Sequence, residues 1–261
     1  MQQSSSTNPQ NLKTPFLTLV AIIAAFAVNV ISNFYPLNGE NIGEISNTLF
    51  KNVLIIPANY AFTIWGVIYL GLFAFGIYQF LPLQRSQTYL NKLRFCLIIA
   101  SIAQCVWVYL FLSRLFSLSI VAMVLILLPL IIAYLHLTSS QIPASGIVKR
   151  YVRLPIGIYL GWISAATVVN VASTLYYQNW DGWGISAENW TLIMLGISTL
   201  IAAILTLQYR ETTYTCVTIW ATIAIAVKQA NNPPLNIVAI ISAILLAGMI
   251  LLRNFSFGKS N

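Results

Sequence analysis

A chain of 261 residues that is 59% hydrophobic and only 7% charged, with mean hydropathy +0.82, is not an ordinary soluble domain, where about a quarter of residues are charged. Its apolar runs are continuous rather than alternating over ~10 residues, so they predict an all-α, polytopic transmembrane helix bundle. The net charge of +8 does not indicate nucleic-acid binding, since the basic residues stand singly between apolar segments.

The apolar runs predict eight spans across a bilayer core of about 30 Å. A polar tail over residues 1–15 precedes them, and the first run lacks a small-residue cleavage site, so we expect it to be a retained helix. A tight turn from Ser113 to Ser117 joins the third and fourth spans, and Asn231 to Pro234 end the seventh. The predicted spans are 16–35, 58–81, 94–113, 117–137, 153–175, 191–208, 213–228 and 235–252.

The basic residues predict the orientation of these spans. With the N-terminus in the cytoplasm, the opposite side holds only Lys51, Arg114 and Lys228 of the 13 Lys and Arg residues. The cytoplasmic segments then hold Lys13, Arg85, Lys92, Arg94, Lys149, Arg150, Arg153, Arg210, Arg253 and Lys259. This asymmetry follows the positive-inside rule. We therefore expect an integral, multi-pass membrane protein whose N- and C-termini are both cytoplasmic.

Two segments on the opposite side stand out. In residues 36–57, Ser46 is expected to cap a short interfacial helix. Residues 176–190 carry five aromatic side chains, Tyr176, Tyr177, Trp180, Trp183 and Trp190. These aromatics are typical of a belt at the lipid headgroups, and a lid over a pocket that opens on this side is the alternative.

Three of the predicted helices carry a tryptophan with a polar or aromatic companion at helical spacing. The pairs are Trp65 with Tyr69, Trp107 with Gln104, and Trp162 with Asn170. Residues at these spacings share a helix face, so each pair forms a stripe suited to the wall of a pocket for a flat amphiphile. An indole offers that ligand both a flat surface and an N–H donor. For Asn29, Gln104 and Asn170 the alternative is a hydrogen bond between helices.

Other chemistry has little support in the sequence. No carboxylate, Lys or Arg stands near the middle of a predicted span, which argues against an ion-coupled pump. No phosphate-binding loop or catalytic triad pattern is evident. The cysteines Cys96, Cys105 and Cys216 lack metal-site spacing, so no zinc site is expected. The single histidine, His136, is a candidate axial haem ligand, but without a partner histidine we interpret it as an interfacial residue.

Three motifs in order add a family resemblance. Pro57, Trp65 and Tyr69 form P-x7-W-x3-Y, and Gln104, Trp107 and Phe111 are followed by Arg114 in a short turn. Trp162 precedes Asn170 with seven residues between them, and Pro155 lies upstream. Together they resemble the second, third and fifth helices of the translocator-protein family, the TspO/MBR or tryptophan-rich sensory proteins. The likeness covers about residues 16–175. The family's usual tryptophan and Lys-Pro pair before the second helix are absent, and Ile56 replaces the first proline of its Pro-Pro pair.

The resemblance implies a five-helix core over 16–175, then an aromatic outer loop over 176–190 and three further transmembrane helices within 191–261. It also implies that the core binds a porphyrin or other tetrapyrrole, haem included, or a sterol-like lipid, with no obligatory cofactor. A sensory or transport role and a homodimer are implied as well. The residues expected to line the pocket are Trp65, Tyr69, Gln104, Trp107, Trp162 and Asn170.

In this interpretation the aromatic side chains stack on the ligand and the amides bind its polar edge. We then expect Trp107→Ala and Trp162→Ala to weaken tetrapyrrole binding while the protein stays folded. Three alternatives remain open at this point: a small-solute transporter of another class, an enzyme that degrades a porphyrin, and a structural or regulatory membrane subunit.

Overall fold

The computed structural model describes residues 12–138, 142, 145–209 and 212–257, so most of the predicted N-terminal tail lies outside the described residues. Within these ranges all regular structure is helical and no strand is present, which confirms the all-α prediction. Seven helical segments are long and apolar enough to cross a membrane, and α10 is shorter. The span that contains α3 reaches this length only together with the turn before it, since it runs from Asn59 to Tyr78. With α10 included, the eight main helices of the described residues are α1 (Lys13–Phe34), α3 (Ile64–Tyr78), α5 (Thr88–Leu112), α6 (Phe116–Leu137), α8 (Leu154–Tyr177), α9 (Ala187–Gln208), α10 (Thr213–Lys228) and α11 (Pro233–Phe257).

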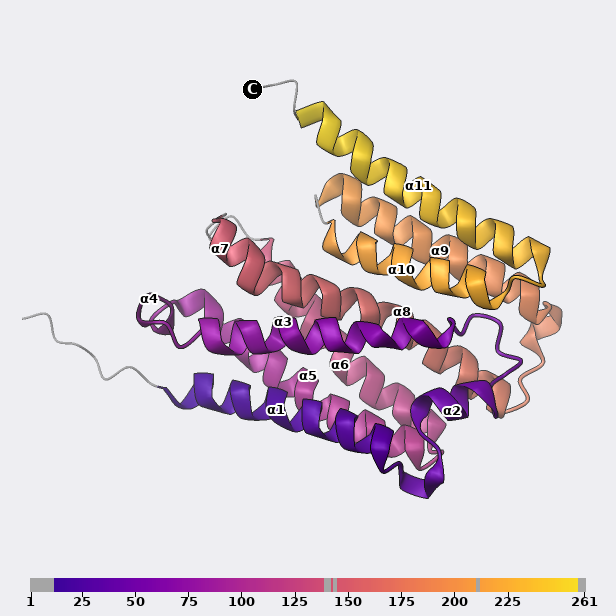
Figure 1. Ribbon diagram of the computed structural model, residues 1–261, viewed down its shortest axis with the longest axis horizontal. Helices are drawn as coiled ribbons and strands as arrows, with labels where there is room; N and C mark the ends of the chain where they lie inside the picture. The colour runs from indigo at the N-terminus through magenta and orange to yellow at the C-terminus, as the bar shows by residue number, and fades with distance from the viewer. Residues whose placement is uncertain (1–11, 139–141, 143–144, 210–211, 258–261) are drawn as a thin grey trace, which may run out of the picture.

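Short helical turns mark the two ends of the bundle. The turns α4 (Pro82–Arg85) and α7 (Gly146–Val148) lie at the end where α1 begins and α11 finishes, whereas α2 (Ile42–Asn47) lies at the opposite end (Figure 1). We call these the α4 end and the α2 end. Successive main helices run in alternate directions, so among the described residues the two groups of basic residues lie at opposite ends of the bundle. Arg210 and Lys259 of the larger group lie outside the described residues. Which end faces the cytoplasm stays a prediction.

Five of the long helices form a closed ring. α5 packs between α1 and α6, α6 packs on α8, and α3 joins α8 back to α1. α10 packs on the outside of α8, and α9 and α11 pack on α10 (Figure 1). α9 does not pack closely on α8, although the two helices are consecutive in the chain. The two helices are therefore held apart by α10, and a gap runs between them.

Helix α10 is held against the ring by small residues and by polar contacts. A Cβ atom added at Gly161 of α8 would lie 2.9 Å from Cβ of Val217, so only glycine allows this approach of the two helices. The 310 turn η2 (Asn59–Thr63) precedes α3, and the segment around it also contacts α10. Three hydrogen bonds make this connection: Ala58 N to Ala224 O at 3.0 Å, Trp220 Nε1 to Ala61 O at 3.1 Å, and Gln229 Nε2 to Leu54 O at 2.8 Å.

The short length of α10 agrees with its sheltered position. Its 16 residues span about 24 Å, less than a hydrocarbon core of about 30 Å. Threonines recur along it, and the hydroxyl groups of Thr218 and Thr222 donate back to carbonyl oxygens of the same helix. Thr215 also lies 2.7 Å from Thr206 of α9, hydroxyl to hydroxyl. A helix with these polar groups is stable here because the hydroxyl groups bond either to carbonyls of their own helix or to α9.

The third predicted span begins earlier than expected, at Thr88 rather than at residue 94. Leu90 and Leu93 in the added turns are completely buried, although polar residues separate them. Arg94 consequently lies inside α5, where it is 1% exposed and its Nε donates to Gln79 Oε1 at 3.1 Å. The apolar run alone marked only the lipid-crossing part of this helix, because hydropathy does not detect an amphipathic extension.

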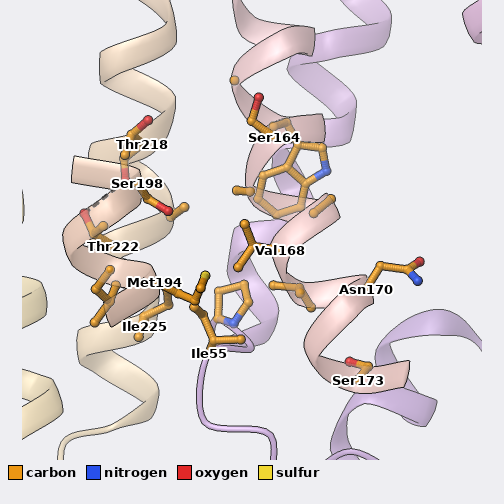
Figure 2. A pocket seen from close by; sticks show the side chains of 18 of the residues that line it. Ile55, Ser164, Val168, Asn170, Ser173, Met194, Ser198, Thr218, Thr222 and Ile225 are labelled. Atoms are coloured by element: carbon orange, nitrogen blue, oxygen red, sulfur yellow. Dashed lines mark hydrogen bonds between the residues drawn. The ribbon is translucent and has the colours of Figure 1, made fainter. Parts of the chain in front are cut away.

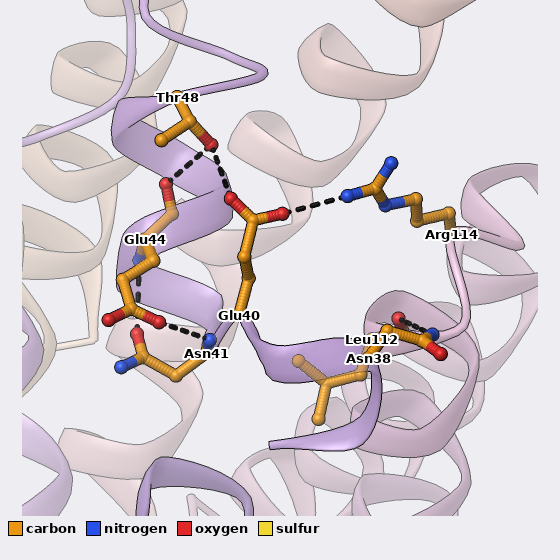
Figure 3. Close-up of polar contacts among 7 residues, drawn as sticks. All are labelled: Asn38, Glu40, Asn41, Glu44, Thr48, Leu112 and Arg114. Atoms are coloured by element: carbon orange, nitrogen blue, oxygen red, sulfur yellow. Dashed lines mark hydrogen bonds and ion pairs between the residues drawn. The ribbon is translucent and has the colours of Figure 1, made fainter.

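The expectation that Ser46 caps a short helix in the 36–57 segment is wrong. The cap of α2 is Asn41, whose Oδ1 accepts from Glu44 N at 3.0 Å while the Glu44 carboxylate accepts from Asn41 N at 2.7 Å (Figure 3). This reciprocal pair is a capping box, which requires an amide or hydroxyl three residues before a glutamate. Ser46 lies in the last turn instead, and its hydroxyl donates to Ile42 O.

The 36–57 segment is fastened to the turn between α5 and α6. Arg114 in that turn has a φ of 59° and forms an ion pair with Glu40 at 2.7 Å (Figure 3). Asn38 Nδ2 donates to the last carbonyl of α5, Leu112 O, at 3.2 Å. The predicted tight turn from Ser113 to Ser117 is confirmed, since α5 ends at Leu112 and α6 begins at Phe116.

Candidate functional site

Residues from two of the sequence motifs meet inside the ring. Nε1 of Trp107 on α5 donates to Oδ1 of Asn170 on α8 at 2.6 Å. The Asn170 amide nitrogen donates to Ser119 Oγ on α6 at 3.0 Å. All three side chains are buried, so this network joins three helices in a region of low dielectric. The sequence analysis gave a hydrogen bond between helices as the alternative role of Asn170, and the structure contains that bond. The Trp107 N–H is therefore already paired with Asn170 and is not available to a ligand.

A cavity of about 140 Å³ lies in the gap between α8, α9 and α10. Trp107, Trp162 and Asn170 are among its lining residues, whereas Trp65, Tyr69 and Gln104 are not. Trp162 is 3% exposed and packs edge-on against Phe62, with ring centres 5.9 Å apart. The structure thus brings three of the six predicted site residues to one cavity and leaves the other three outside it.

The opposite wall of this cavity comes from residues that the sequence reasoning missed. Met194 and Ser198 of α9, with Thr218, Thr222 and Ile225 of α10, face α8 across the space (Figure 2). The motif resemblance ended at about residue 175, so it gave no reason to select them. The spacing of Thr218 and Thr222, one turn apart on a short apolar helix, was a signal that could have found part of this wall.

The amide of Asn170 lies at the rim of the cavity. In Figure 2 its side chain points away from Met194, Thr218 and Thr222, toward the interior of the five-helix ring. This orientation follows from its bonds to Trp107 and Ser119. Ser164 and Thr222 also line the cavity, and the hydroxyl groups of both donate to carbonyls of their own helices.

A groove of about 640 Å³ continues from the cavity toward the α2 end. Ile55, Val168 and Met194 line both spaces, so the two adjoin. The remaining lining of the groove comes from the 52–55 segment, from α8 and from the predicted aromatic loop, including Trp180, Trp183 and Trp190. We call the two together the α8–α9 seam.

The loop beside the groove is built around a tryptophan cluster. Ring centres of Trp180 lie 5.4 Å from those of both Trp183 and Trp190. Trp190 Nε1 donates to Gly182 O at 2.9 Å and so closes the loop. Trp183 has a φ of 53° and is 77% exposed, a strained backbone for a bulky residue that presents an indole outward. This geometry is compatible with both interpretations of the segment, an interfacial belt and a lid.

The other three predicted site residues have separate surroundings. Trp65 stacks on Tyr69 with ring centres 5.7 Å apart, and the Tyr69 hydroxyl donates to Ala25 O of α1 at 3.0 Å. Gln104 is 1% exposed, and within the described residues neither its amide nitrogen nor its carbonyl oxygen has a hydrogen-bond partner. Their role in ligand binding stays a prediction.

The single histidine lies away from the seam. His136 Nε2 is 3.1 Å from the carbonyl oxygen of Tyr89, near the α4 end. It lines neither the cavity nor the groove. Within the part of the chain that the structure describes, no three His, Cys, Asp or Glu residues are grouped to hold a metal ion.

A family model described as TSPO-like protein matches residues 15–252. The match therefore continues through α9, α10 and most of α11, beyond the segment that carried the motif resemblance. No curated protein and no solved structure matches the chain.

Proposed function

Since the chain belongs to the TSPO-like protein family and is an integral, multi-pass membrane protein, we propose that it binds an amphiphilic aromatic ligand in the α8–α9 seam. A porphyrin or other tetrapyrrole, or a sterol-like lipid, is the ligand class, and the binding serves sensing or transport. The observation that carries the proposal is the continuity of the cavity beside Trp107 and Trp162 with the groove beside the tryptophan loop.

The size of the seam supports a ligand that occupies both spaces. Ligand pockets typically enclose about 300–1,000 Å³. The inner cavity of about 140 Å³ is too small for a tetrapyrrole, whereas the groove of about 640 Å³ falls within that range. A flat ligand would therefore lie mainly in the groove and extend one apolar edge between Val168 and Met194 into the cavity.

The chemistry of the lining supports an amphiphile. The inner cavity is bounded mostly by apolar side chains such as Ile55 and Ile225, together with hydroxyl groups that are already bonded to their own helices. Polar side chains with exposed atoms gather at the outer end of the groove, where Asn52 and Asp181 lie. The apolar body of a ligand would enter the seam, and its polar edge would remain near the α2 end.

Titration of the purified protein with protoporphyrin IX, followed by tryptophan quenching and by the shift of the Soret band, tests the proposal. Val168→Phe fills the junction of cavity and groove and is expected to weaken binding about tenfold or more, or by ~1.4 kcal/mol, because the phenyl ring occupies space that the ligand would need. Val121→Phe is the matched control, because Val121 is exposed on α6 and lines neither space.

Equal, saturable binding in the wild type, Val168→Phe and Val121→Phe would reject the seam as the site. Linear quenching in all three would reject specific tetrapyrrole binding. If binding is specific, movement of the porphyrin across reconstituted vesicles distinguishes the two proposed roles: a transporter moves it, and a sensor saturates without flux.

A further inference from the structure

A second groove, of about 930 Å³, lies on the other side of α8, where α3, α8 and α10 come together. Its apolar wall includes Val67 of α3, Ile158 of α8, and Val217 and Trp220 of α10. It shares no lining residue with the α8–α9 seam, so the two are separate spaces. We call it the α3–α10 groove.

Three cations gather where this groove reaches the α4 end. Lys149 and Arg153 come from the π-helical turn η3 (Lys149–Arg153) that leads into α8, and Arg253 comes from the last turns of α11. Lys149 and Arg153 are four residues apart, so their side chains lie on the same face of this helical segment. Arg150, between them, does not line the groove and lies over the ring of Tyr151 instead.

The positive charges of these side chains are not neutralised by acidic partners in the described part of the chain. Within the described residues no acidic side chain lines the groove, and neither Lys149 nor Arg153 forms an ion pair. Arg253 Nη1 donates to Thr206 O at 3.2 Å, while its Nε is buried without a hydrogen-bond partner. A buried guanidinium nitrogen left without an acceptor is costly, so an acceptor brought by a ligand would stabilise it.

We infer that the α3–α10 groove binds an anionic membrane lipid. Its phosphate would lie against Lys149, Arg153 and Arg253, and an acyl chain would extend along α8 toward Trp220. The charge of the groove end and the apolar character of its wall match the two parts of such a lipid, and basic pockets between membrane helices recognise acidic headgroups in this way. The site needs α10 and α11 as well as the five-helix ring.

Protection of the exposed Cys216, which lines the groove, reports occupancy directly. The full chain carrying Cys96→Ala and Cys105→Ala is placed in phosphatidylcholine nanodiscs, and the rate of maleimide labelling is measured during titration with lysophosphatidylglycerol. We expect a saturable slowing of labelling. Lysophosphatidylcholine with the same acyl chain, inorganic phosphate without a chain, and oleate with a carboxylate head are titrated in parallel and should protect weakly.

Lys149→Gln with Arg153→Gln should raise the half-saturating concentration of lysophosphatidylglycerol about tenfold, because each cation near the headgroup strengthens its binding. Lys92→Gln with Arg150→Gln removes the same charge outside the groove and should leave protection unchanged. Lys149→Arg with Arg153→Lys should retain protection, which separates loss of charge from loss of folding.

If both double glutamine variants lose the protection of Cys216 equally, the inference is overturned. General attraction of the anionic lipid to a basic surface would then explain the protection. Equal protection by lysophosphatidylcholine, by inorganic phosphate alone, or by oleate in place of the phospholipid would overturn it too. None of these results bears on porphyrin binding in the α8–α9 seam, because the two spaces share no residue.

Discussion

The indole N–H of Trp107 and the side-chain carbonyl of Asn170 lie 2.6 Å apart, 63 residues apart in the chain. Two residues that the sequence selected as ligand contacts therefore contact each other. Asn170 is held further by Ser119, so a ligand in the seam meets a rigid wall of α8 rather than a free amide. The main role of Asn170 in this structure is therefore to hold α5, α6 and α8 in position through its bonds to Trp107 and Ser119.

The bond between Trp107 and Asn170 predicts a coupling free energy in a double-mutant cycle of Trp107→Phe and Asn170→Leu. We expect the two losses of stability to differ from additivity by ~0.6–1.7 kcal/mol, the range of hydrogen bonds between membrane helices. Reversible unfolding in mixed micelles measures it. Trp107→Phe combined with Asn33→Leu, an exposed amide on α1, should be additive. If the losses of stability in Trp107→Phe and Asn170→Leu are additive, the hydrogen bond between the two residues does not stabilise the protein.

The earlier expectation for Trp107→Ala changes for the same reason. Trp107 is 6% exposed, and deleting a buried indole typically costs ~3–5 kcal/mol through the cavity it leaves. We expect Trp107→Ala to unfold at lower denaturant concentration than Trp107→Phe. Thermal or denaturant unfolding should therefore precede any interpretation of its ligand binding, and equal stability of the two variants would contradict this expectation.

Gln104 tests the cost of burying polar atoms that have no hydrogen-bond partner. Its amide and carbonyl are unsatisfied within the described residues, and such groups cost ~1–3 kcal/mol, so Gln104→Leu should raise the free energy of unfolding by about 1 kcal/mol. Gln87→Leu, at an exposed position, is the control and should have little effect. If Gln104→Leu instead abolishes porphyrin binding in a folded protein, Gln104 contacts the ligand as the sequence predicted.

Gly161 determines how closely α10 approaches α8. Gly161→Leu places new atoms against Val217 and Tyr214, and overpacking of this kind costs ~1–3 kcal/mol. We expect lower stability and altered binding in the seam that α10 helps to form. Gly66→Leu is the matched change, because nothing lies within 4 Å of a Cβ at that helical position. If Gly161→Leu and Gly66→Leu change stability and binding equally, the close contact at Gly161 does not determine how α10 packs on α8.

Trp183 distinguishes the belt from the lid. Its φ of 53° penalises any side chain, so Trp183→Gly should be more stable than Trp183→Ala by about 1 kcal/mol. An interfacial belt predicts that brominated lipid quenches Trp183 and that porphyrin binds both variants like the wild type. A lid predicts weaker porphyrin binding by both variants. Unfolding and binding measured on the same samples decide between these interpretations.

Labelling from one side of the membrane tests the orientation. In a background without native cysteines, we expect a membrane-impermeant maleimide to label Ser117→Cys in intact cells and Ser86→Cys only after permeabilisation. Ser117 lies exposed in the first turn of α6 at the α2 end, and Ser86 lies exposed between α4 and α5 at the α4 end. The reverse pattern would invert the topology, and labelling of both from one side would contradict a full crossing by α5.

The sequence by itself determined the class of fold and the approximate helices. Long apolar runs must form helices in lipid, because a helix satisfies its own backbone hydrogen bonds there. The same local rule located the turn at Ser113 to Ser117 and the stop before α11. It missed the amphipathic start of α5, with Leu90 and Leu93, because hydropathy detects the lipid-facing run and not a helix that continues beyond it.

Only the tertiary structure decided which site residues meet. Trp65 and Trp107 have similar motifs, yet Trp107 reaches the seam and Trp65 stacks on Tyr69, because a stripe on a helix does not specify its partner helix. The seam exists since α10, held by contacts such as Gly161 with Val217, separates α8 from α9. Such contacts join residues far apart in the chain, and their geometry depends on the packing of all the helices together.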